Sequence, residues 1–176
     1  MVELVKQIIE FYLKNGKEPT LNDLSGLEER YIQDKAALFV TLYLNGEVRG
    51  SSGNVKEIES SIAGELIQNT IAAMSSDHRF TPLSLVEAKE IKVRVDVISE
   101  RQILQDGGLE KVDPTKSGVV TIKKDYTKLA TILPNMSAKL LTGADLMPVL
   151  EKKLGEKFEE RNYIVYEIHT EVFTDY

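Results

Sequence analysis

The sequence predicts an α+β fold with a mainly antiparallel sheet flanked by helices, and three observations lead to it. Apolar residues recur at helical spacing in some segments and at strand spacing, or in short unbroken runs, in others. Turn signals join neighbouring strand segments, which favours hairpins and antiparallel pairing. Helices and strands follow one another without the regular alternation of a parallel βαβ sheet.

The first half of the chain begins with a helix, because apolar residues recur at helical spacing over 2–13 and Gly16 stands where a helix would end. Residues 17–35 predict a connection with one helical turn. The apolar run 36–44 is typical of a strand buried on both faces. Asn45-Gly46 then predicts a type I′ hairpin turn, since both central positions of that turn need positive φ.

The return strand is expected over Glu47–Gly50, with Arg49 at its end. A loop of small residues, 51–54, should follow it, and then a helix over about Glu57–Ser75. Asn54 and Glu57 would form a capping box for that helix, although a start near Ser60 is equally compatible with the pattern.

The second half of the chain predicts further strands and helices of the same kinds. They are a short helix at 85–89, a half-buried strand at 91–97, a hairpin of 118–122 with 129–133, a helix within 142–154 that contains Pro148, and a last alternating strand over 164–172.

Composition sets limits on function. With 176 residues, the chain is about one domain long, although two lobes that share a cleft also fit this length. The net charge of −6 argues against binding that depends on nucleic-acid phosphates. The absence of cysteine excludes disulfides, thiolate metal sites and cysteine nucleophiles. We find no signal-peptide pattern and no membrane-length apolar run, so we expect a cytoplasmic protein without a membrane anchor.

Two short segments stand out as a candidate site for a ligand or partner, and they should lie against each other around a recess that solvent reaches. The residues are Arg49, Gly50, Ser51, Ser52, Gly53, Asp77 and Arg79. Glycines would let backbone N–H groups meet an anion at a helix N-terminus, with Arg49 as a bidentate partner. Alternatively, the glycines serve only a tight turn, Arg49 pairs with a carboxylate at the rim of the core, and Phe80 fills the core.

No residue is assigned to catalysis or to a metal, and no cofactor is identified. Ser51 as a nucleophile needs a positioned base, and the only imidazoles are those of His78 and His169. No Gly-x-Ser-x-Gly pattern is present. His169 with Glu167 and Glu171 on one strand face is more typical of a solvated face than of a metal site.

Several motifs in order resemble the AMMECR domain family, and the resemblance covers most of the chain. They are Phe39–Leu42, Arg49-Gly50-x-x-Gly53, Asp77-x-Arg79-Phe80-x-Pro82-Leu83 and Leu133-Pro134. The resemblance implies a single AMMECR-type domain over residues 1–176, divisible into two unequal lobes with a cleft. The family's biochemical activity is not established.

In prokaryotes the family resembles the A component of a proposed three-part system (AmmeMemoRadiSam) with Memo-like and radical-SAM proteins. The chain departs from the family pattern in three places: Ser51 replaces a usual cysteine, Ser52 an isoleucine and His78 a frequent proline. We therefore expect an accessory component that binds a partner or a small anionic ligand. The alternative is a metal-independent enzyme that acts on a small anionic substrate in the cleft around Arg49.

Overall fold

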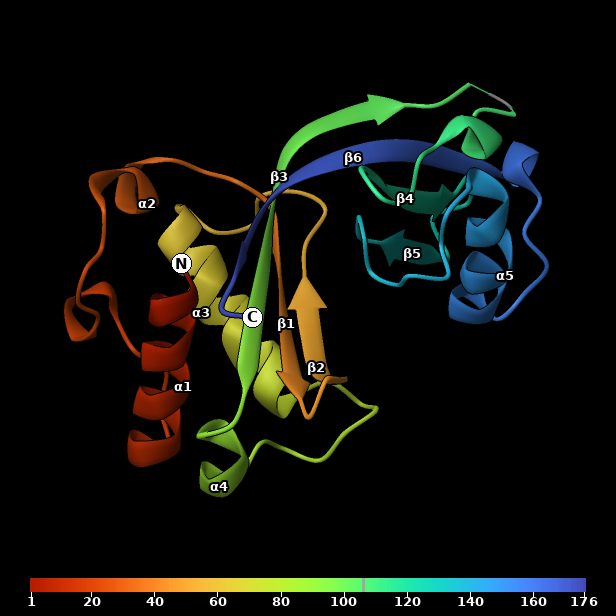
Figure 1. Cartoon of the computed structure of the whole chain (residues 1–176). Coiled ribbons are helices and arrows are strands. Elements are labelled where there is room, and N and C mark those ends of the chain that lie inside the picture. Colours follow the sequence, from red (N-terminus) through yellow and green to blue (C-terminus); the bar gives the residue numbers. More distant parts are fainter. Residues whose placement is uncertain (106) are drawn as a thin grey trace. The chain divides into compact units, whose positions relative to one another are not determined.

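The structure, a computed structural model, describes residues 1–105 and 107–176 (Figure 1). The helices are α1 (Val2–Asn15), α2 (Glu29–Gln33), α3 (Ile62–Ser75), α4 (Leu85–Ala88) and α5 (Gly143–Leu154). The strands are β1 (Leu38–Leu44), β2 (Glu47–Gly53), β3 (Lys92–Ile103), β4 (Gly118–Lys123), β5 (Leu129–Ile132) and β6 (Tyr163–Thr174). Short 3₁₀ turns are η1 (Leu21–Asp23), η2 (Leu109–Lys111) and η3 (Glu160–Asn162).

The predicted α+β class is confirmed. The six strands follow the order β2-β1-β3-β6-β4-β5, and β1 pairs antiparallel with both β2 and β3, as β4 does with β5 and β6. The chain divides into two units, unit 1 (Met1–Val97 with Val172–Tyr176) and unit 2 (Ile98–Glu171). The cleft between two lobes stays a prediction.

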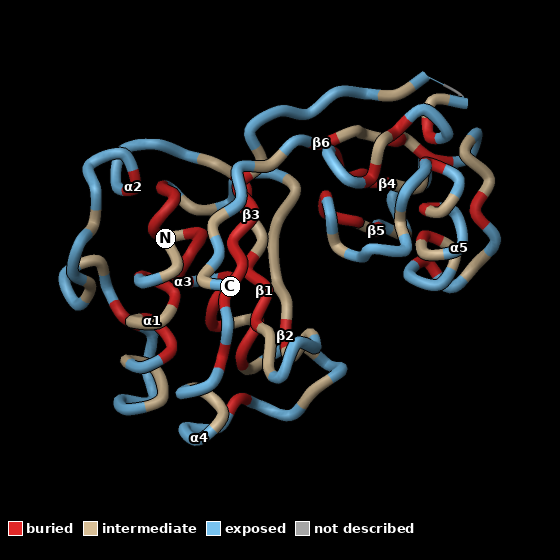
Figure 2. The backbone as a smooth tube through the Cα atoms, viewed as in Figure 1, coloured by how far each residue is buried: buried red, intermediate tan, exposed pale blue. Residues whose placement is uncertain are grey.

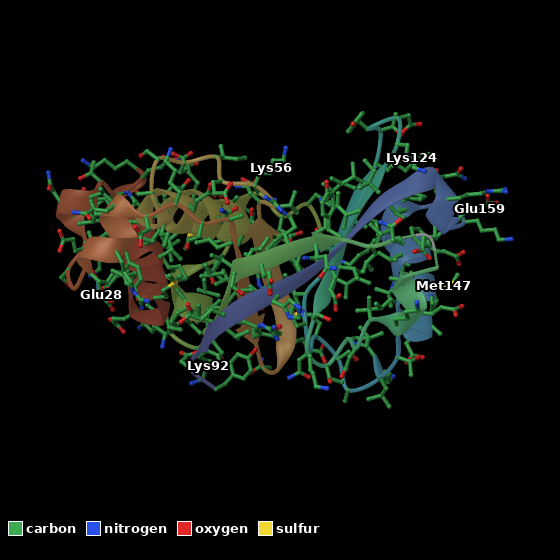
Figure 3. The ribbon with its side chains drawn as sticks, turned by 90° about the horizontal axis from the view of Figure 1, so that it is seen from above. Glu28, Lys56, Lys92, Lys124, Met147 and Glu159 are labelled. Atoms are coloured by element: carbon green, nitrogen blue, oxygen red, sulfur yellow. The ribbon has the colours of Figure 1, made fainter. Side chains whose placement is uncertain are left out.

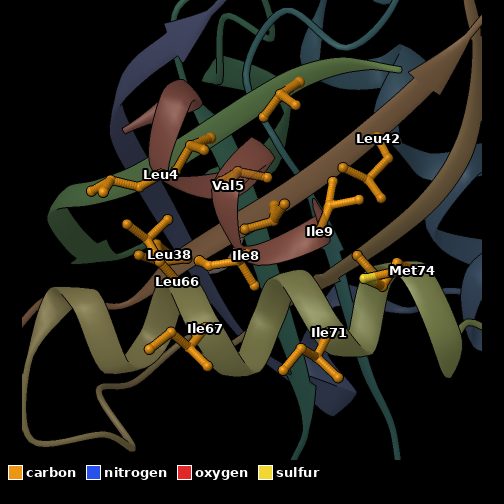
Figure 4. Close-up of a cluster of buried hydrophobic side chains, with 14 of the residues drawn as sticks. Leu4, Val5, Ile8, Ile9, Leu38, Leu42, Leu66, Ile67, Ile71 and Met74 are labelled. Carbon is orange, nitrogen blue, oxygen red and sulfur yellow. The ribbon is translucent and has the colours of Figure 1, made fainter. Parts of the chain in front are cut away.

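The core of unit 1 lies between β1, β3 and two helices. Helix α3 packs on β1 and β2, and α1 packs on α3. Leucine, isoleucine and valine side chains from α1, β1 and α3 interdigitate there (Figure 4). Buried positions run along β1 and the first half of β3 (Figure 2), whereas charged side chains such as Glu28, Lys56 and Lys92 project outward (Figure 3).

Local signals in unit 1 are confirmed. Helix α1 ends at Gly16, which has φ 65°. Asn45 and Gly46 have φ 53° and 83°, as the hairpin turn requires. Strand β1 is buried on both faces, with Val40 on one and Thr41 on the other.

Two predictions about β2 and α3 are wrong in detail. Residues 51–53 are not a loop, because β2 continues to Gly53 in register with β1. Helix α3 starts at Ile62 with Ser61 as its N-cap, close to the later start that the pattern also allowed. Instead of capping, the Asn54 amide donates to Glu65 at 3.0 Å.

The half-buried strand predicted at 91–97 is buried on both faces. Val93, Val95 and Val97 belong to the core of unit 1. On the other face, Arg94 and Asp96 are buried as a pair, with Nε–Oδ2 and Nη2–Oδ1 distances of 2.7 Å. Opposite charges that hydrogen-bond to each other can be buried where single charges cannot, so the charged positions gave a misleading picture of exposure.

Unit 2 confirms the second hairpin, formed by β4 and β5, and the helix α5, whose second turn contains Pro148. Its core joins η2, α5 and β6. The last strand does not bury one face only. Tyr163 and Val165 enter this core, whereas Ile168 is buried on the opposite face and His169 is exposed.

Membrane-spanning helices and metal-binding clusters are both absent from residues 1–105 and 107–176. No helix there has both the length and the apolar character to cross a bilayer. No group of three or more His, Cys, Asp or Glu side chains in these ranges could hold a metal ion.

Candidate functional site

Arg49 is the extra residue of a β-bulge. Leu42 pairs with Gly50 and Tyr43 pairs with Val48, so Arg49 has no partner on β1. Strand β2 lies at one end of the strand order and is an edge strand. A bulge changes the direction of the side chain that it carries, and here the bulge falls on the arginine of the sequence motif.

The guanidinium of Arg49 is held by Glu87 of α4. Nε donates to Oε1 at 2.7 Å and Nη2 donates to Oε2 at 3.2 Å, a side-on bidentate pair. The Arg49 side chain is 12% exposed. This geometry matches the alternative in which Arg49 pairs with a carboxylate at the rim of the core.

Glu87 also caps its own helix, and we did not predict it as a site residue. Its Oε2 accepts from the backbone N and the hydroxyl of Ser84 at 2.9 and 2.8 Å, while the Ser84 hydroxyl accepts from the Glu87 N–H. The hydrogen bond from Arg49, followed by those from Ser84, lowers the pKa of Glu87 to about 2. The Ser-x-x-Glu pattern at 84–87 is a capping-box signal for the helix predicted at 85–89, and it could have revealed the role of Glu87.

Asp77 joins the two predicted segments. Its Oδ2 accepts from the backbone N–H of Ser51 at 3.0 Å, so the expected contact between β2 and the Asp77 corner is present. Arg79 donates to the same carboxylate through Nε and Nη2, at 2.9 and 2.6 Å, and lowers the pKa of Asp77 to about 2. The carboxylate thereby satisfies an N–H on an exposed sheet edge.

Phe80 is not the core residue that we predicted. It is half-buried and lies near two guanidinium groups, with Arg49 Cζ 5.6 Å and Arg79 Cζ 5.2 Å from the ring centroid. Both distances are within the range of cation–π interactions. The turn at 77–80, closed by the Phe80 N–H to Asp77 O bond of 3.0 Å, keeps the ring near the surface.

Gly50 and Gly53 serve close packing, neither a turn nor an anion site at a helix N-terminus. A Cβ on Gly50 would lie 2.1 Å from the carbonyl oxygen of Ala73 in α3. A Cβ on Gly53 would lie 2.1 Å from the Phe39 ring. Both glycines are within β2, so the expected convergence of their N–H groups at the start of α3 does not occur.

Ser52 is connected by hydrogen bonds to the buried carboxylate of Glu65, which we did not predict as a site residue. Its hydroxyl donates to Asn69 Oδ1 at 3.1 Å, and Asn69 donates to Glu65 Oε2 at 3.0 Å. Glu65 is 0% exposed and also accepts from Asn54 and from the backbone N–H groups of Ile58 and Glu59. The sequence signal is weak, because Glu65 and Asn69 lie at the edge of the apolar inward face of α3, where polar side chains are common.

Ser51 has no catalytic environment in the described part of the chain. Its hydroxyl lies 3.2 Å from that of Thr41 across the strand pair, and no imidazole is bonded to it there. The recess expected at this site also stays a prediction. The structure has cavities of about 310 Å³ in unit 2 and about 200 Å³ beside α1, and the candidate residues line neither of them.

Comparisons with known proteins agree with this picture. The AMMECR1 family model matches residues 2–173. A Thermotoga maritima protein is 33% identical over 118 residues, 66% of each chain. A Clostridium acetobutylicum protein is 29% identical over 152 residues, which are 86% of this chain but 31% of the relative. The crystal structure of an uncharacterised protein from Pyrococcus horikoshii has a TM-score of 0.85 at 22% identity, covering 98% of this chain and 88% of that one, and shares the fold.

Proposed function

The chain belongs to the AMMECR1 family, and on that premise we propose that it is an accessory component that binds a protein partner through unit 1. The partners that the family resemblance implies are Memo-like and radical-SAM proteins. The contact would be made by the α4 surface, defined here as the exposed side chains of Leu85 and Val86. The cytoplasmic location expected from the sequence belongs to the same proposal.

One observation carries the proposal: two adjacent apolar side chains are held out into solvent by a braced helix. Leu85 is 56% exposed and Val86 is 76% exposed. Helix α4 has four residues, too few to be stable alone. Its capping box and the Arg49–Glu87 pair fix it, and just before it the Leu83 N–H donates to Met74 O at 2.7 Å. A surface ordered in advance loses less entropy on binding.

The titration of the site favours binding over catalysis. A general acid or base works best with a pKa near the operating pH. Glu87 and Asp77, the two carboxylates beside the arginines, both have pKa values lowered to about 2 by their ion pairs. At neutral pH they are fully ionised, which suits a structural brace.

The Clostridium relative gives independent support. The region similar to this chain is 31% of that protein, so the domain there shares one polypeptide with a longer additional segment. A domain that is covalently joined to other segments in one relative is the kind expected to work beside other proteins.

We expect Val86→Asp to weaken binding of a Memo-like partner at least tenfold, because a charge would enter an apolar contact. Isothermal titration calorimetry of the intact chain measures this effect. The matched control is Ile58→Asp, an aliphatic residue that is 69% exposed near the other end of α3. Equal affinity of the two variants would rule out the α4 surface as the contact.

A second candidate function is the binding or turnover of a small anionic molecule. The unsatisfied hydrogen-bonding capacity of one nitrogen atom of Arg49 favours it. Nη1 of Arg49 is buried and has no hydrogen-bond partner among the described residues, whereas Nε and Nη2 both bind Glu87. A carboxylate or phosphate would supply the missing acceptor. Native mass spectrometry should then find a metabolite on the wild type that is absent from Arg49→Ala; no retained metabolite on either would reject this candidate.

A further inference from the structure

Unit 2 contains a cavity of about 310 Å³ that the site in unit 1 does not use. Residues 102–105 at the end of β3 form one wall, and Gly108, Lys111 and Val112 around η2 form another. Glu167 of β6 closes the lining. Cavities that bind small ligands start at about 300 Å³, so this one can hold a molecule of amino-acid size.

Glu167 is a carboxylate at the edge of an apolar core. It follows Tyr163 and Val165 on the same face of β6, and these two residues are buried in the core of unit 2. The buried hydroxyl of Ser117 donates to Glu167 Oε1 and so fixes one carboxylate oxygen. No cationic side chain within residues 1–105 and 107–176 pairs with Glu167, which leaves the carboxylate able to accept from a cation in the cavity.

Lys111 brings the opposite charge to the same cavity. Its ammonium forms no ion pair with any residue that the structure describes. Leu104 and Val112 add apolar surface to the same lining, and Gln102 and Gln105 add amide groups. A negative and a positive group that line one cavity without pairing are complementary to a molecule that carries both charges.

We propose that this cavity binds a small zwitterion with an apolar body, an amino acid or short peptide of the leucine type. The ammonium group of the ligand donates to Glu167, its carboxylate accepts from Lys111, and its side chain packs on Leu104 and Val112. A ligand with only one of the two charges would leave the other protein charge without a partner, so it should bind more weakly.

Titration calorimetry of the intact chain with three matched probes tests the charge requirement. L-leucine carries both charges, 3-methylbutylamine lacks the carboxylate, and 4-methylpentanoate lacks the ammonium. We expect saturable binding of L-leucine that is at least tenfold tighter than binding of either analogue. Absence of saturable leucine binding, or equal affinity for leucine and an analogue, would overturn the proposal.

Variants locate the site. Glu167→Gln keeps the shape of the side chain and should weaken leucine binding at least tenfold, whereas Lys111→Gln should weaken it severalfold. Lys116→Gln is the control, since that exposed lysine pairs with Asp113 outside the cavity lining. Leucine should also shift the amide resonances of Gly108, Lys111 and Val112 in the unmodified chain. Unchanged affinity in Glu167→Gln, or unshifted resonances in the unmodified chain, would refute the assignment.

Discussion

Replacing Gly50 by alanine should lower the free energy of unfolding by about 2–3 kcal/mol, as overpacking of a tight contact does. The new Cβ would lie 2.1 Å from the carbonyl oxygen of Ala73. Both groups are backbone-fixed, so β2 and α3 must move apart and the packing between them loosens. Urea unfolding followed by circular dichroism measures the change.

Ser51→Ala is the control for this experiment, because it is the next residue of β2 and loses only a hydroxyl contact of 3.2 Å with Thr41. Its cost should be about 0.5–1.5 kcal/mol, the usual range for one hydrogen bond. If Gly50→Ala is as stable as the wild type, α3 does not lie against β2 as closely as described.

Glu65→Ala should cost about 3–5 kcal/mol, because each buried donor that loses its acceptor costs about 1–3 kcal/mol and several lose it at once. The substitution leaves the Asn54 side chain and the backbone N–H groups of Ile58 and Glu59 without their acceptor, and Asn69 keeps only its bond to the backbone oxygen of residue 65. Thermal or urea unfolding would report the loss. Hydrogen exchange at the amide of Glu59 should also accelerate, because Glu65 binds it directly.

Glu57→Ala is the matched comparison, since Glu57 is an exposed glutamate in the segment that Glu65 holds. Surface substitutions of this kind usually change stability by less than about 0.5 kcal/mol. Similar stabilities of Glu57→Ala and Glu65→Ala would mean that the buried carboxylate is not the anchor of this segment.

Local chemistry explains the parts of the fold that could be predicted. The hairpin at Asn45-Gly46 and the end of α1 at Gly16 depend on positive φ values, which few residues adopt without strain. The Asp77 corner was also anticipated, and it does meet β2 through the Ser51 N–H. The two turns depend on the residues themselves, whereas the Asp77–Ser51 contact joins residues 26 positions apart.

Non-local packing explains the errors. Residues 51–53 have the composition of a loop, but pairing with β1 keeps them in a strand. In the sequence, Arg94 and Asp96 have the pattern of an exposed strand face. In the structure they are buried because they form an ion pair with each other. The Arg49–Glu87 contact joins residues far apart in the sequence, and no spacing pattern connects a bulge on β2 with a capping residue on α4.

Position 51 illustrates why a family motif can tolerate substitution. Asp77 binds the backbone N–H there, which any residue other than proline provides. Serine, which stands in place of the cysteine usual in the AMMECR family, therefore keeps this contact. The residue also keeps a small side chain beside Thr41.

The role we assign to Arg49 is to hold α4 and its apolar side chains in place through Glu87. Hydrogen exchange of the Glu87 and Ala88 amides in Arg49→Gln tests it, with Arg79→Gln as a control that leaves the Arg49–Glu87 pair intact. We predict exchange at least tenfold faster in Arg49→Gln alone. Exchange at the wild-type rate in that variant would show that Arg49 does not hold α4 in place.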